Sequence, residues 1–498
     1  MRIGIDFGTT RTLVAAADRG SYPIVSFTDD DGEAHEHLPS LVADDGGKLV
    51  FGLAAARAMR AGKPALRSFK RMLATPAAAA DAPVRVGSIT TPLLSLLGAY
   101  AAHVREQLER RSNAPKKRGD KKLEAVIAVP ANALSGARFL TLEAFKRAGF
   151  DVIGMLNEPS AAGFEYTHRQ GATVTSRRTR VLVYDLGGGT FDASLVRVDG
   201  DRHDVLATAG DPLLGGDDFD LALLELALAE AKVGMPDDPL ALLEQCRDVK
   251  ERIQPQSRKI AIDLASIGGP TVTIAVEAFY EAAAPLAQRT IEAMRPLVPQ
   301  LDEEGLVDVA GIYLVGGGSG LPIIARALRD RFGRRVHRSP YPAASTAIGL
   351  AIAADDASSF ALSDRFGRSF GVFREADGGR AVSFDPIVPP DAQVPSTGAL
   401  EIKRRYRAQH NVGHYRFVEC RALGDGGAPQ GDVVPFGEVW FPFDAALRDA
   451  DCTKVAVERR DAGPEVEETY AVDPTGLVSV RIRDLDTGFE RGFHLGAS

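Results

Sequence analysis

The sequence is poor in cysteine and in long apolar runs, and each shortage excludes a class of protein. Three cysteines occur among 498 residues, and an odd number of widely separated cysteines does not form a disulfide framework. No apolar run reaches the roughly 18 residues that a membrane-spanning helix requires. Asp6 also interrupts the place where a signal peptide would carry its apolar core. We therefore expect a cytoplasmic protein that does not associate with membranes.

The sequence also lacks an excess of positive charge. Lys and Arg number 59 against 67 Asp and Glu, which gives a formal net charge of -8. A nucleic-acid-binding protein requires a basic face, so we expect no nucleic-acid partner. Hydrophobic residues make up 45% of the chain and charged residues 25%, which is typical of a globular protein with sizeable cores.

The pattern of apolar residues changes near residue 355. Before this point, apolar runs typical of buried strands alternate with segments of helical spacing, at residues 94–110, 123–130, 179–186, 219–231 and 309–317. This alternation predicts an α/β fold for residues 1–356. The polar segment 357–371 is predicted to be a linker. Short runs with period-two alternation follow, and they predict an all-β sandwich domain over residues 372–498.

The most informative feature is a pseudo-repeat. Residues 3–15 and 181–196 each predict a β-hairpin whose tight turn carries an aspartate before glycine and threonine. The first turn contains Asp6, Gly8, Thr9 and Thr10, and the second contains Asp185, Gly187, Gly188, Gly189, Thr190 and Asp192. Glycines allow successive N–H groups to converge on an anion, and threonine hydroxyls add donors. A carboxylate beside a phosphate needs a cation between them, so Asp6 and Asp185 predict Mg²⁺ held through water.

A third glycine-rich element lies at residues 312–328, where a strand runs through Gly316, Gly317 and Gly318 into a helix. Such a junction presents helix N-terminal amides to an anion or a polar ligand. One such cluster is more often a simple turn or helix start, but three together predict a nucleotide-binding site. The absence of a Gly-x4-Gly-Lys-Ser/Thr motif excludes a P-loop, and a dinucleotide-binding fold is disfavoured because no Gly-x-Gly-x-x-Gly follows the first strand.

The three elements GIDFGTTRTLVA, VYDLGGGTFDASLV and YLVGGGSGLP resemble the two phosphate motifs and the adenosine motif of the actin/hexokinase-type ATPase fold. Within that superfamily, the chain is similar to the seventy-kilodalton heat-shock chaperones of the DnaK type. Supporting segments are FKRML at 69–73, IAVPA at 127–131, NEPSAAGFEY at 157–166, LLGGDDFD at 213–220 and YAVDPTGLVSVRIRDLDTG at 470–488. The resemblance implies a two-lobed α/β ATPase domain followed by a β-sandwich that binds polypeptide.

The resemblance implies roles for residues that handle the phosphates. Thr9, Thr10 and Arg11 would contact the β- and γ-phosphates, and Lys70 would orient the γ-phosphate and the attacking water. Without the flanking match, Lys70 would be interpreted as a solvated lysine on a helix. Other nucleotide-binding positions implied by the resemblance are Gly8, Gly187, Gly188, Gly189, Gly215, Gly216, Lys250, Gln254, Gly316, Gly317, Gly318 and Ser319.

Two further sets of residues take roles from the resemblance. Glu158, Asp185 and Asp192 would surround the attacking water and the hydrated Mg²⁺, with Thr190 near the γ-phosphate. Outside this context, a glutamate before a proline is more often a turn residue or helix start. Pro130 and Arg138 would relay the nucleotide state to the other domain. A simple strand terminator remains a competing interpretation of Pro130.

The chain departs from the family pattern around the adenine and at the linker. The family presents Glu, Lys and Ser on one helix where this chain has Arg247, Lys250 and Gln254, and Gly320 replaces a clamping Arg. Weaker adenine recognition is therefore expected. FALSD at 360–364 replaces a run of leucines, which predicts weaker coupling between the domains. The sequence ends after the β-region, so we expect no helical lid.

The resemblance implies an ATP-dependent chaperone that switches its β-domain between fast and slow exchange of apolar extended peptides. The implied cofactors are ATP or ADP, Mg²⁺ and K⁺. The implied partners of a monomeric chain are a client polypeptide, a J-domain co-chaperone and a nucleotide-exchange factor. The alternative is a weakly hydrolysing or silent nucleotide-binding scaffold for one dedicated partner, which the altered clamp and linker favour somewhat. A small-molecule kinase would not require a C-terminal β-domain, and such a domain would obstruct filament formation.

Overall fold

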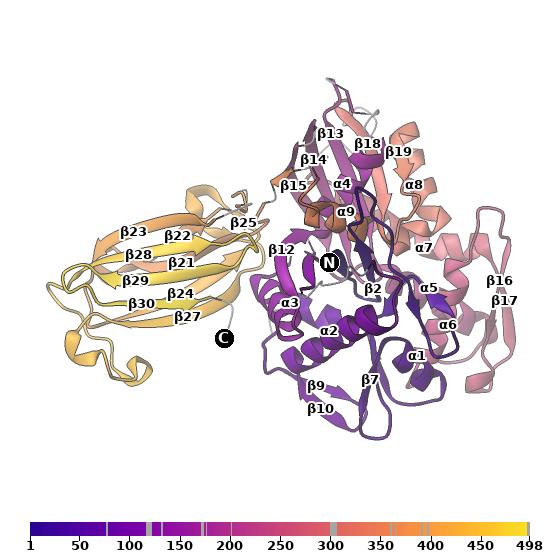
Figure 1. The fold of residues 1–498 in the computed structure, drawn as a ribbon, viewed down its shortest axis with the longest axis horizontal. Coiled ribbons are helices and arrows are strands. Elements are labelled where there is room, and N and C mark those ends of the chain that lie inside the picture. The colour runs from indigo at the N-terminus through magenta and orange to yellow at the C-terminus, as the bar shows by residue number, and fades with distance from the viewer. Residues whose placement is uncertain are drawn as a thin grey trace. The chain divides into compact units, whose positions relative to one another are not determined.

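The computed structural model divides into two compact units (Figure 1). The first comprises residues 1–72, 83–132 and 144–362, and the second comprises residues 73–82, 133–143 and 363–498. The structure describes residues 1–75, 78–115, 122–130, 133–170, 174–175, 177–200, 202–298, 306–358, 361–363, 365–389, 392–395 and 398–495. Each unit has its own sheets and its own hydrophobic core.

Helices of the described residues follow the periodic apolar segments of the sequence. Their bounds are α1 Gly52–Arg60, α2 Leu93–Arg110, α3 Ser135–Arg147, α4 Glu158–Gln170, α5 Gly216–Ala231, α6 Leu240–Glu251, α7 Val276–Ala293, α8 Pro322–Phe332 and α9 Ser345–Ala354. Helix α2 buries Leu93, Leu97, Tyr100 and Val104 along one side, as a 3.6-residue period requires. The helices expected at residues 94–110 and 219–231 are therefore confirmed.

Two mixed sheets form the centre of the first unit. One has the order β12-β11-β1-β2-β5, with β1 Arg2–Phe7, β2 Arg11–Ala16, β5 Leu38–Pro39, β11 Glu124–Val129 and β12 Asp151–Asn157. The other has the order β19-β18-β13-β14-β15-β20, with β13 Arg180–Leu186, β14 Phe191–Asp199, β15 Arg202–Asp211, β18 Val309–Val315, β19 Val336–Arg338 and β20 Ala361–Ser363. In each sheet an antiparallel hairpin adjoins a parallel strand, β1–β2 beside β11 and β13–β14 beside β18. The pseudo-repeat is thus a repeat of topology.

Helices α4 and α9 pack against each other and against the two sheets, α9 on β1, β2 and β11 and α4 on β13 and β14. Small residues make this close packing possible. A Cβ built at Gly4 would lie 2.3 Å from the backbone N of Ala351, and one at Gly349 would lie 1.8 Å from the carbonyl O of Ala161. Any side chain at either glycine would push these layers apart, and this packing fixes the hairpin turns in position.

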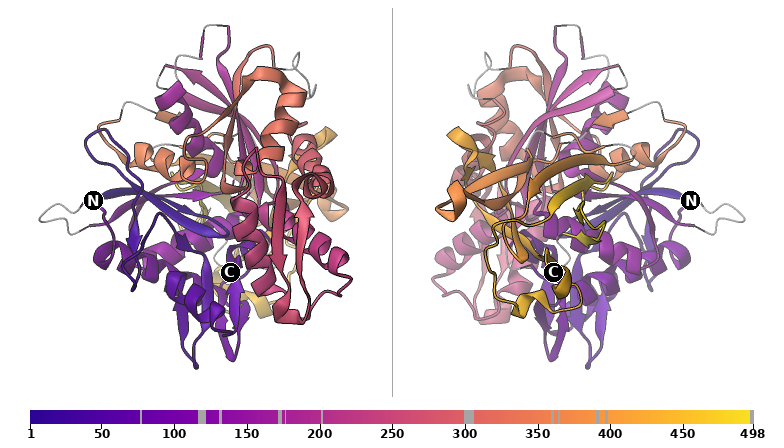
Figure 2. Two further views of the ribbon diagram at one scale, coloured as in Figure 1. Left: turned by 90° about the vertical axis from the view of Figure 1, so that its right-hand side faces the viewer. Right: turned by 90° about the vertical axis from the view of Figure 1, so that its left-hand side faces the viewer.

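The first unit also contains shorter strands outside the two central sheets. They are β3 Phe27–Thr28, β4 Ala34–His35, β6 Leu41–Asp44, β7 Leu49–Phe51, β8 Ala65–Arg67, β9 Pro83–Val86, β10 Ile89–Pro92, β16 Lys259–Asp263 and β17 Thr271–Ala275. The hairpin β16–β17 packs beside helices α5, α6 and α7, as the left view of Figure 2 shows. The short 3-10 helix Phe69–Ala74 follows β8 and carries Lys70.

Two four-stranded antiparallel sheets form the second unit (Figure 1). One has the order β22-β21-β24-β27, with β21 Ser369–Ala376, β22 Ala381–Val388, β24 Val412–Cys420 and β27 Val434–Pro442. The other has the order β23-β28-β29-β30, with β23 Leu400–Arg407, β28 Glu465–Val472, β29 Val478–Asp484 and β30 Glu490–His494. A short hairpin joins β25 Ala422–Leu423 to β26 Pro429–Gln430. Side chains from both sheets form one core, as in a β-sandwich.

The segment expected to be a linker contains regular structure. Strand β20 occupies Ala361–Ser363, and β21 begins at Ser369, so residues 369–371 belong to the sandwich. These residues are buried, and they pair with residues 418–420 of β24, the neighbour of β21 in the sheet. Phe360 and Asp364 of the FALSD segment lie outside the described residues. No helix in the described ranges is long and apolar enough to span a membrane.

Candidate functional site

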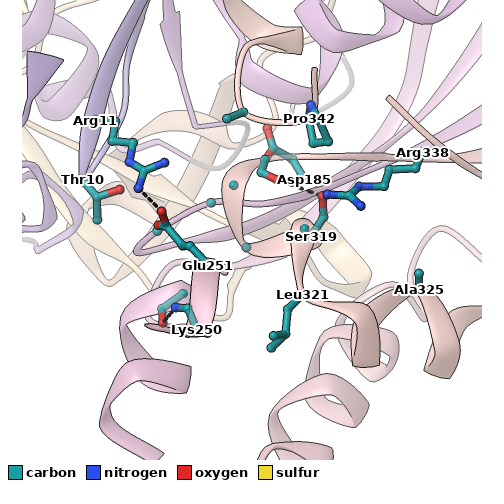
Figure 3. A pocket seen from close by; sticks show the side chains of 18 of the residues that line it. Thr10, Arg11, Asp185, Lys250, Glu251, Ser319, Leu321, Ala325, Arg338 and Pro342 are labelled. Atoms are coloured by element: carbon teal, nitrogen blue, oxygen red, sulfur yellow. Dashed lines mark hydrogen bonds and ion pairs between the residues drawn. The ribbon is translucent and has the colours of Figure 1, made fainter. Parts of the chain in front are cut away.

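A cleft of about 720 Å³ lies in the first unit, where the two hairpin turns and the third glycine cluster meet (Figure 3). Most of the residues proposed from sequence line it, namely Asp6, Gly8, Thr9, Thr10, Arg11, Glu158, Asp185, Gly187, Gly188, Thr190, Gly216, Lys250, Gln254, Gly316, Gly317, Gly318 and Ser319. Lys70, Asp192, Gly189 and Gly215 are not among the lining residues but contact it from behind, as described below. The structure therefore brings together elements spread over some three hundred residues of sequence.

The two hairpin turns touch each other through their glycines. A Cβ at Gly188 would lie 2.4 Å from the Thr10 side chain, and one at Gly189 would lie 2.5 Å from the Thr9 side chain. A Cβ at Gly215 would lie 2.5 Å from the backbone of Gly189. These contacts leave no room for side chains, so the glycines allow the turns to close on the same space. Converging backbone N–H groups in such a space form a site for an anion.

The third glycine cluster approaches the second turn. Gly316 has a φ of 81°, and a Cβ there would lie 2.3 Å from Asp185 Oδ1. Glycine is therefore required at this position both by backbone conformation and by space. A 3-10 turn over Gly317–Gly320 follows, and Ser319 Oγ donates to the carbonyl O of Gly316 at 2.8 Å. Helix α8 begins directly afterwards at Pro322.

Four carboxylates and one lysine form a buried cluster at the closed end of the cleft. Lys70 Nζ donates to Glu158 Oε1 at 2.7 Å, and both side chains are buried. Burial and the charge of Glu158 raise the pKa of Asp6 to about 7, against a smaller opposing effect of Lys70. Burial, followed by the charges of Glu158, Asp6 and Asp192, raises the pKa of Asp185 well above its usual range. One cation does not neutralise four carboxylates at this place.

The composition of this cluster fits a hydrated divalent cation. Asp6 and Asp185 offer oxygen ligands beside the glycine turns, and a divalent cation would favour the ionised form of both carboxyl groups, whose pKa values burial raises. Among the residues that the structure describes, no group of three or more His, Cys, Asp or Glu side chains is arranged to bind a metal ion directly.

An ion-pair network crosses the first unit from β8 to helices α5 and α6, and sequence analysis missed it. Arg67 NH2 lies 2.9 Å from Asp217 Oδ1 and Arg67 NH1 lies 2.9 Å from Glu244 Oε1. Arg247 NH2 lies 2.7 Å from the same Asp217 oxygen, and Arg247 NH1 lies 3.1 Å from the same Glu244 oxygen. Long sequence separation hides such pairs, because Arg67 and Asp217 have no shared local pattern.

Lys250 and Gln254 line the same cleft, but the ammonium group of Lys250 is already bound by other residues of the chain. Its Nζ lies 2.6 Å from Asp220 Oδ1 and donates to the carbonyl O of Gly216 at 2.6 Å. Lys250 therefore ties helix α6 to the start of α5 next to the second turn. Arg11, which was expected at the phosphates, forms an ion pair with Glu251 across the cleft (Figure 3).

The two residues expected to relay the nucleotide state lie outside the cleft. Pro130 follows strand β11 directly and is half-buried. Arg138 lies on helix α3, in the part that contacts assign to the second unit, and its NH1 donates to the carbonyl O of Thr475 at 3.3 Å. Nearby, Ser135 Oγ donates to Glu419 Oε2 at 2.9 Å. Residues 131–132 lie outside the described part of the chain.

A second cleft, of about 730 Å³, lies in the β-sandwich unit. Its lining includes six arginines, two histidines and three carboxylates, together with Phe373, Val382 and Val457. At its floor, the lining residues Arg374 and Tyr406 contact Glu468, which is buried beneath them and does not line the cleft. Arg374 NH2 lies 2.7 Å from Glu468 Oε2, and Tyr406 and the buried Tyr470 donate their hydroxyls to Glu468 at 2.5 Å. Glu468 is fully buried. This floor is polar, which sequence alternation alone did not indicate.

Known proteins are similar in sequence to nearly the whole chain. A family model described as Hsp70 protein matches residues 100–372, which contain Glu158, the second hairpin turn and the third glycine cluster. A chaperone protein HscA homolog from Burkholderia multivorans is 32% identical over 523 aligned residues, covering 98% of this chain and 77% of that relative. The homologs of the same name from Burkholderia mallei and Burkholderia pseudomallei are 31% and 32% identical with the same coverage.

Proposed function

The chain belongs to the Hsp70 family of ATP-hydrolysing chaperones, and from this premise we propose that it couples ATP hydrolysis in its first unit to binding and release of client polypeptide by its β-sandwich. The observation that carries this proposal is the convergence of three glycine-rich turns on the buried Lys70–Glu158 pair. Such an arrangement provides an anion site and a fixed cation where a phosphoryl group would transfer. The ATPase and chaperone assignments follow from the family, and the coupling is our proposal.

In the proposed mechanism, the turns hold the nucleotide by its phosphates. The N–H groups around Gly8 and Gly188 donate to phosphate oxygens, and the hydroxyls of Thr9, Thr10 and Thr190 add further donors. Because no side chain can be accommodated between the turns, the phosphates approach the backbone closely. Gly215, which packs on Gly189, and Gly216 allow the start of α5 to close over them.

Lys70 and Glu158 provide the reactive end of the cleft. Lys70 places its ammonium near the transferring group, where it stabilises developing negative charge. Glu158 holds that ammonium in position and, with Asp192, accepts hydrogen bonds from the attacking water. Mg²⁺, when bound through water by Asp6 and Asp185, would neutralise charge on the phosphates. Burial of the cluster excludes bulk water from the reaction.

The β-sandwich cleft is the proposed client site. An extended segment entering it would gain main-chain hydrogen bonds, which are independent of side-chain identity. The polar floor formed by Glu468 and Arg374 does not support the expected preference for apolar segments. A J-domain co-chaperone and a nucleotide-exchange factor are the partners we propose by family likeness.

One observation favours the alternative, a scaffold for one dedicated partner. Two residues that line the cleft, Arg374 and Tyr406, belong to an internally satisfied network with the buried Glu468 and Tyr470. A general chaperone needs a pocket that accepts many apolar side chains, whereas a satisfied polar network discriminates against them. A partner that presents matching polar groups would be selected.

The test is the dissociation rate of a fluorescent peptide with and without Mg-ATP. Two peptides of equal length are compared, one apolar and one acidic, on the wild type and on Lys70→Ala. Faster dissociation in ATP is expected for at least one peptide, because nucleotide and client sites are coupled. Binding without any ATP effect would favour the scaffold. No binding to either peptide would contradict a general client site.

A further inference from the structure

The far end of the nucleotide cleft is where a nucleobase would lie. The glycine turns occupy one end of the cleft, so a nucleotide bound there by its phosphates extends its base toward the other. Figure 3 shows Leu321, Ala325 and Arg338 across the cleft from Thr10 and Arg11 of the first turn, and Ile253, Pro255 and Tyr280 also line the cleft. These residues provide apolar surfaces that suit a planar ring. A cation positioned over the ring would add affinity through its attraction to the π system.

Three of the five arginines that line this cleft, Arg11, Arg247 and Arg326, are paired with carboxylates, whereas the described residues show no such pair for Arg329 or Arg338. Arg247 is bound by three carboxylates of the network described above, and its side chain is only 12% exposed. Arg326 NH1 lies 3.3 Å from Glu277 Oε1. Moving Arg247 onto a base would leave buried carboxylates without their partner, which is costly. Arg247 is therefore not available for stacking.

Arg338 is differently placed. It ends strand β19, where it pairs in register with Leu314 of β18. Within the described part of the chain, no hydrogen bond or ion pair holds its side chain, which is exposed at the cleft. Figure 3 shows this side chain extending toward Ser319 at the third glycine cluster. It is thus an unengaged guanidinium at the base end of the cleft.

The space that Arg338 fills is created by Gly320. A Cβ built at Gly320 would lie 3.2 Å from Arg338 NH2, which is closer than an ordinary contact. Any side chain at residue 320 would therefore displace the Arg338 guanidinium. The family resemblance places an arginine where this chain has Gly320, and the fold brings the Arg338 guanidinium close to that position from strand β19.

We propose that Arg338 stacks its guanidinium on the nucleobase and restores the contact that Gly320 cannot make. This rests on the proposed nucleotide-binding function and names the residue that fixes the base. A planar guanidinium contacts the face of the base rather than its hydrogen-bonding edge, so the strength of this contact depends little on which base is bound. Adenine and guanine nucleotides should benefit equally from it.

The first experiment compares Arg338→Ala with Arg334→Ala. Arg334 is an exposed arginine four residues earlier that does not line the cleft, so both variants lose one positive charge. Dissociation constants are measured by calorimetry for Mg-ADP, Mg-GDP and inorganic tripolyphosphate. We expect Arg338→Ala to raise the Kd of both nucleotides about tenfold and to leave that of tripolyphosphate within about twofold. Arg334→Ala should leave all three within about twofold.

Moving the guanidinium from residue 338 to residue 320 distinguishes a loss of stacking from a disturbance of the fold by Arg338→Ala. Gly320→Arg alone should not tighten ADP binding, because the new side chain collides with Arg338 and places two like charges together. Gly320→Arg combined with Arg338→Ala should recover most of the affinity lost by Arg338→Ala. Recovery would not occur if Arg338→Ala had merely disturbed the fold.

The outcomes distinguish this inference from the proposed function. If the wild type binds ADP and Arg338→Ala binds it equally well, the base does not contact Arg338 and the inference is wrong. An equal loss of tripolyphosphate affinity would also overturn it, because the residue would then act on the phosphates. If the wild type binds no nucleotide, the proposed function itself fails.

Discussion

Lys70 Nζ lies 2.7 Å from Glu158 Oε1, although 88 residues separate the two in sequence. Lys70 is placed by the short helix Phe69–Ala74, and Glu158 is the first residue of helix α4. Both side chains are buried, so each charge depends on the other for compensation. The pair therefore joins two parts of the first unit directly behind the glycine-rich hairpin turns, and we expect its loss to have separable effects on chemistry and on stability.

Lys70→Ala is expected to reduce ATP hydrolysis about 100- to 1,000-fold in single-turnover measurements, because a fixed positive charge near the transferring group is lost. Nucleotide affinity should change by less than about fivefold, since the glycine turns remain intact. Breaking a buried pair also lowers the free energy of unfolding, by about 3 kcal/mol. Thermal denaturation followed by circular dichroism measures this cost separately from activity.

The control for this prediction is Lys63→Ala, which removes a half-exposed lysine outside the cleft. It should change neither hydrolysis nor stability measurably. If Lys70→Ala abolishes ADP binding while remaining folded, Lys70 is a ground-state ligand of the phosphates rather than a residue that acts on the transferring group.

Arg67→Ala is expected to accelerate ADP dissociation about tenfold, equivalent to about 1.4 kcal/mol. Arg67 pairs with Asp217 and Glu244 and so joins strand β8 to helices α5 and α6 next to the cleft. Its removal weakens the closed arrangement without touching the nucleotide. Stopped-flow release of a fluorescent ADP analogue measures the rate. Arg57→Ala, on the exposed face of α1, should leave the rate unchanged.

The phosphate turns could be predicted from sequence because their chemistry is local. Aspartate, glycine and threonine must follow one another within one turn, so the motif is complete in a dozen residues. The apolar run of β13 and the helical spacing of α2 were likewise confirmed, since burial periodicity is visible in a single segment.

The rest of the site could not be predicted because it depends on pairs from distant segments. Nothing near Arg67 in sequence indicates Asp217, and nothing near Gly320 indicates that Arg338 fills its space. The polar floor of the cleft in the β-sandwich could not be predicted from sequence either, because it also depends on residues from distant segments. Glu468 lies on a strand whose other residues are largely buried, and only the packed structure shows that Arg374 accompanies it.

The contribution of His37 to the stability of the first unit is expected to fall as the pH falls below about 6.5, whereas the raised pKa of Asp6 acts in the opposite direction. Burial, followed by the charge of Arg11, lowers the pKa of His37 to about 3. The unfolded chain therefore takes up a proton at His37 below its normal pKa while the folded chain does not, and this favours unfolding. The loss is at most about 1.4 kcal/mol per pH unit between pH 6 and pH 4.

His37→Gln tests this pH dependence, because glutamine removes the titrating group. Thermal midpoints are measured by circular dichroism between pH 7.5 and pH 4.5, and the midpoint of the variant relative to that of the wild type should rise as the pH is lowered. Identical slopes would show that His37 is protonated in the folded chain or that other groups dominate the transition.

Glu468→Ala is expected to destabilise the β-sandwich by about 3–5 kcal/mol, because Arg374 would lose its buried partner and two tyrosine hydroxyls would lose their acceptor. The single tryptophan of the chain, Trp440, lies on strand β27 of this unit and stacks on His414 at 3.8 Å. Its fluorescence therefore reports unfolding of the β-sandwich separately from the first unit.

Replacing both Arg374 and Glu468 with methionine distinguishes a stabilising network from a recognition device. An apolar pair of similar volume removes the need for charge compensation, so the double variant should recover much of the stability lost in Glu468→Ala. If the polar floor selects the client, the double variant should also bind the apolar peptide more tightly than the wild type does and the acidic peptide less tightly. Recovered stability with unchanged peptide preference would mean that the network supports the fold and that the client contacts other residues of the cleft.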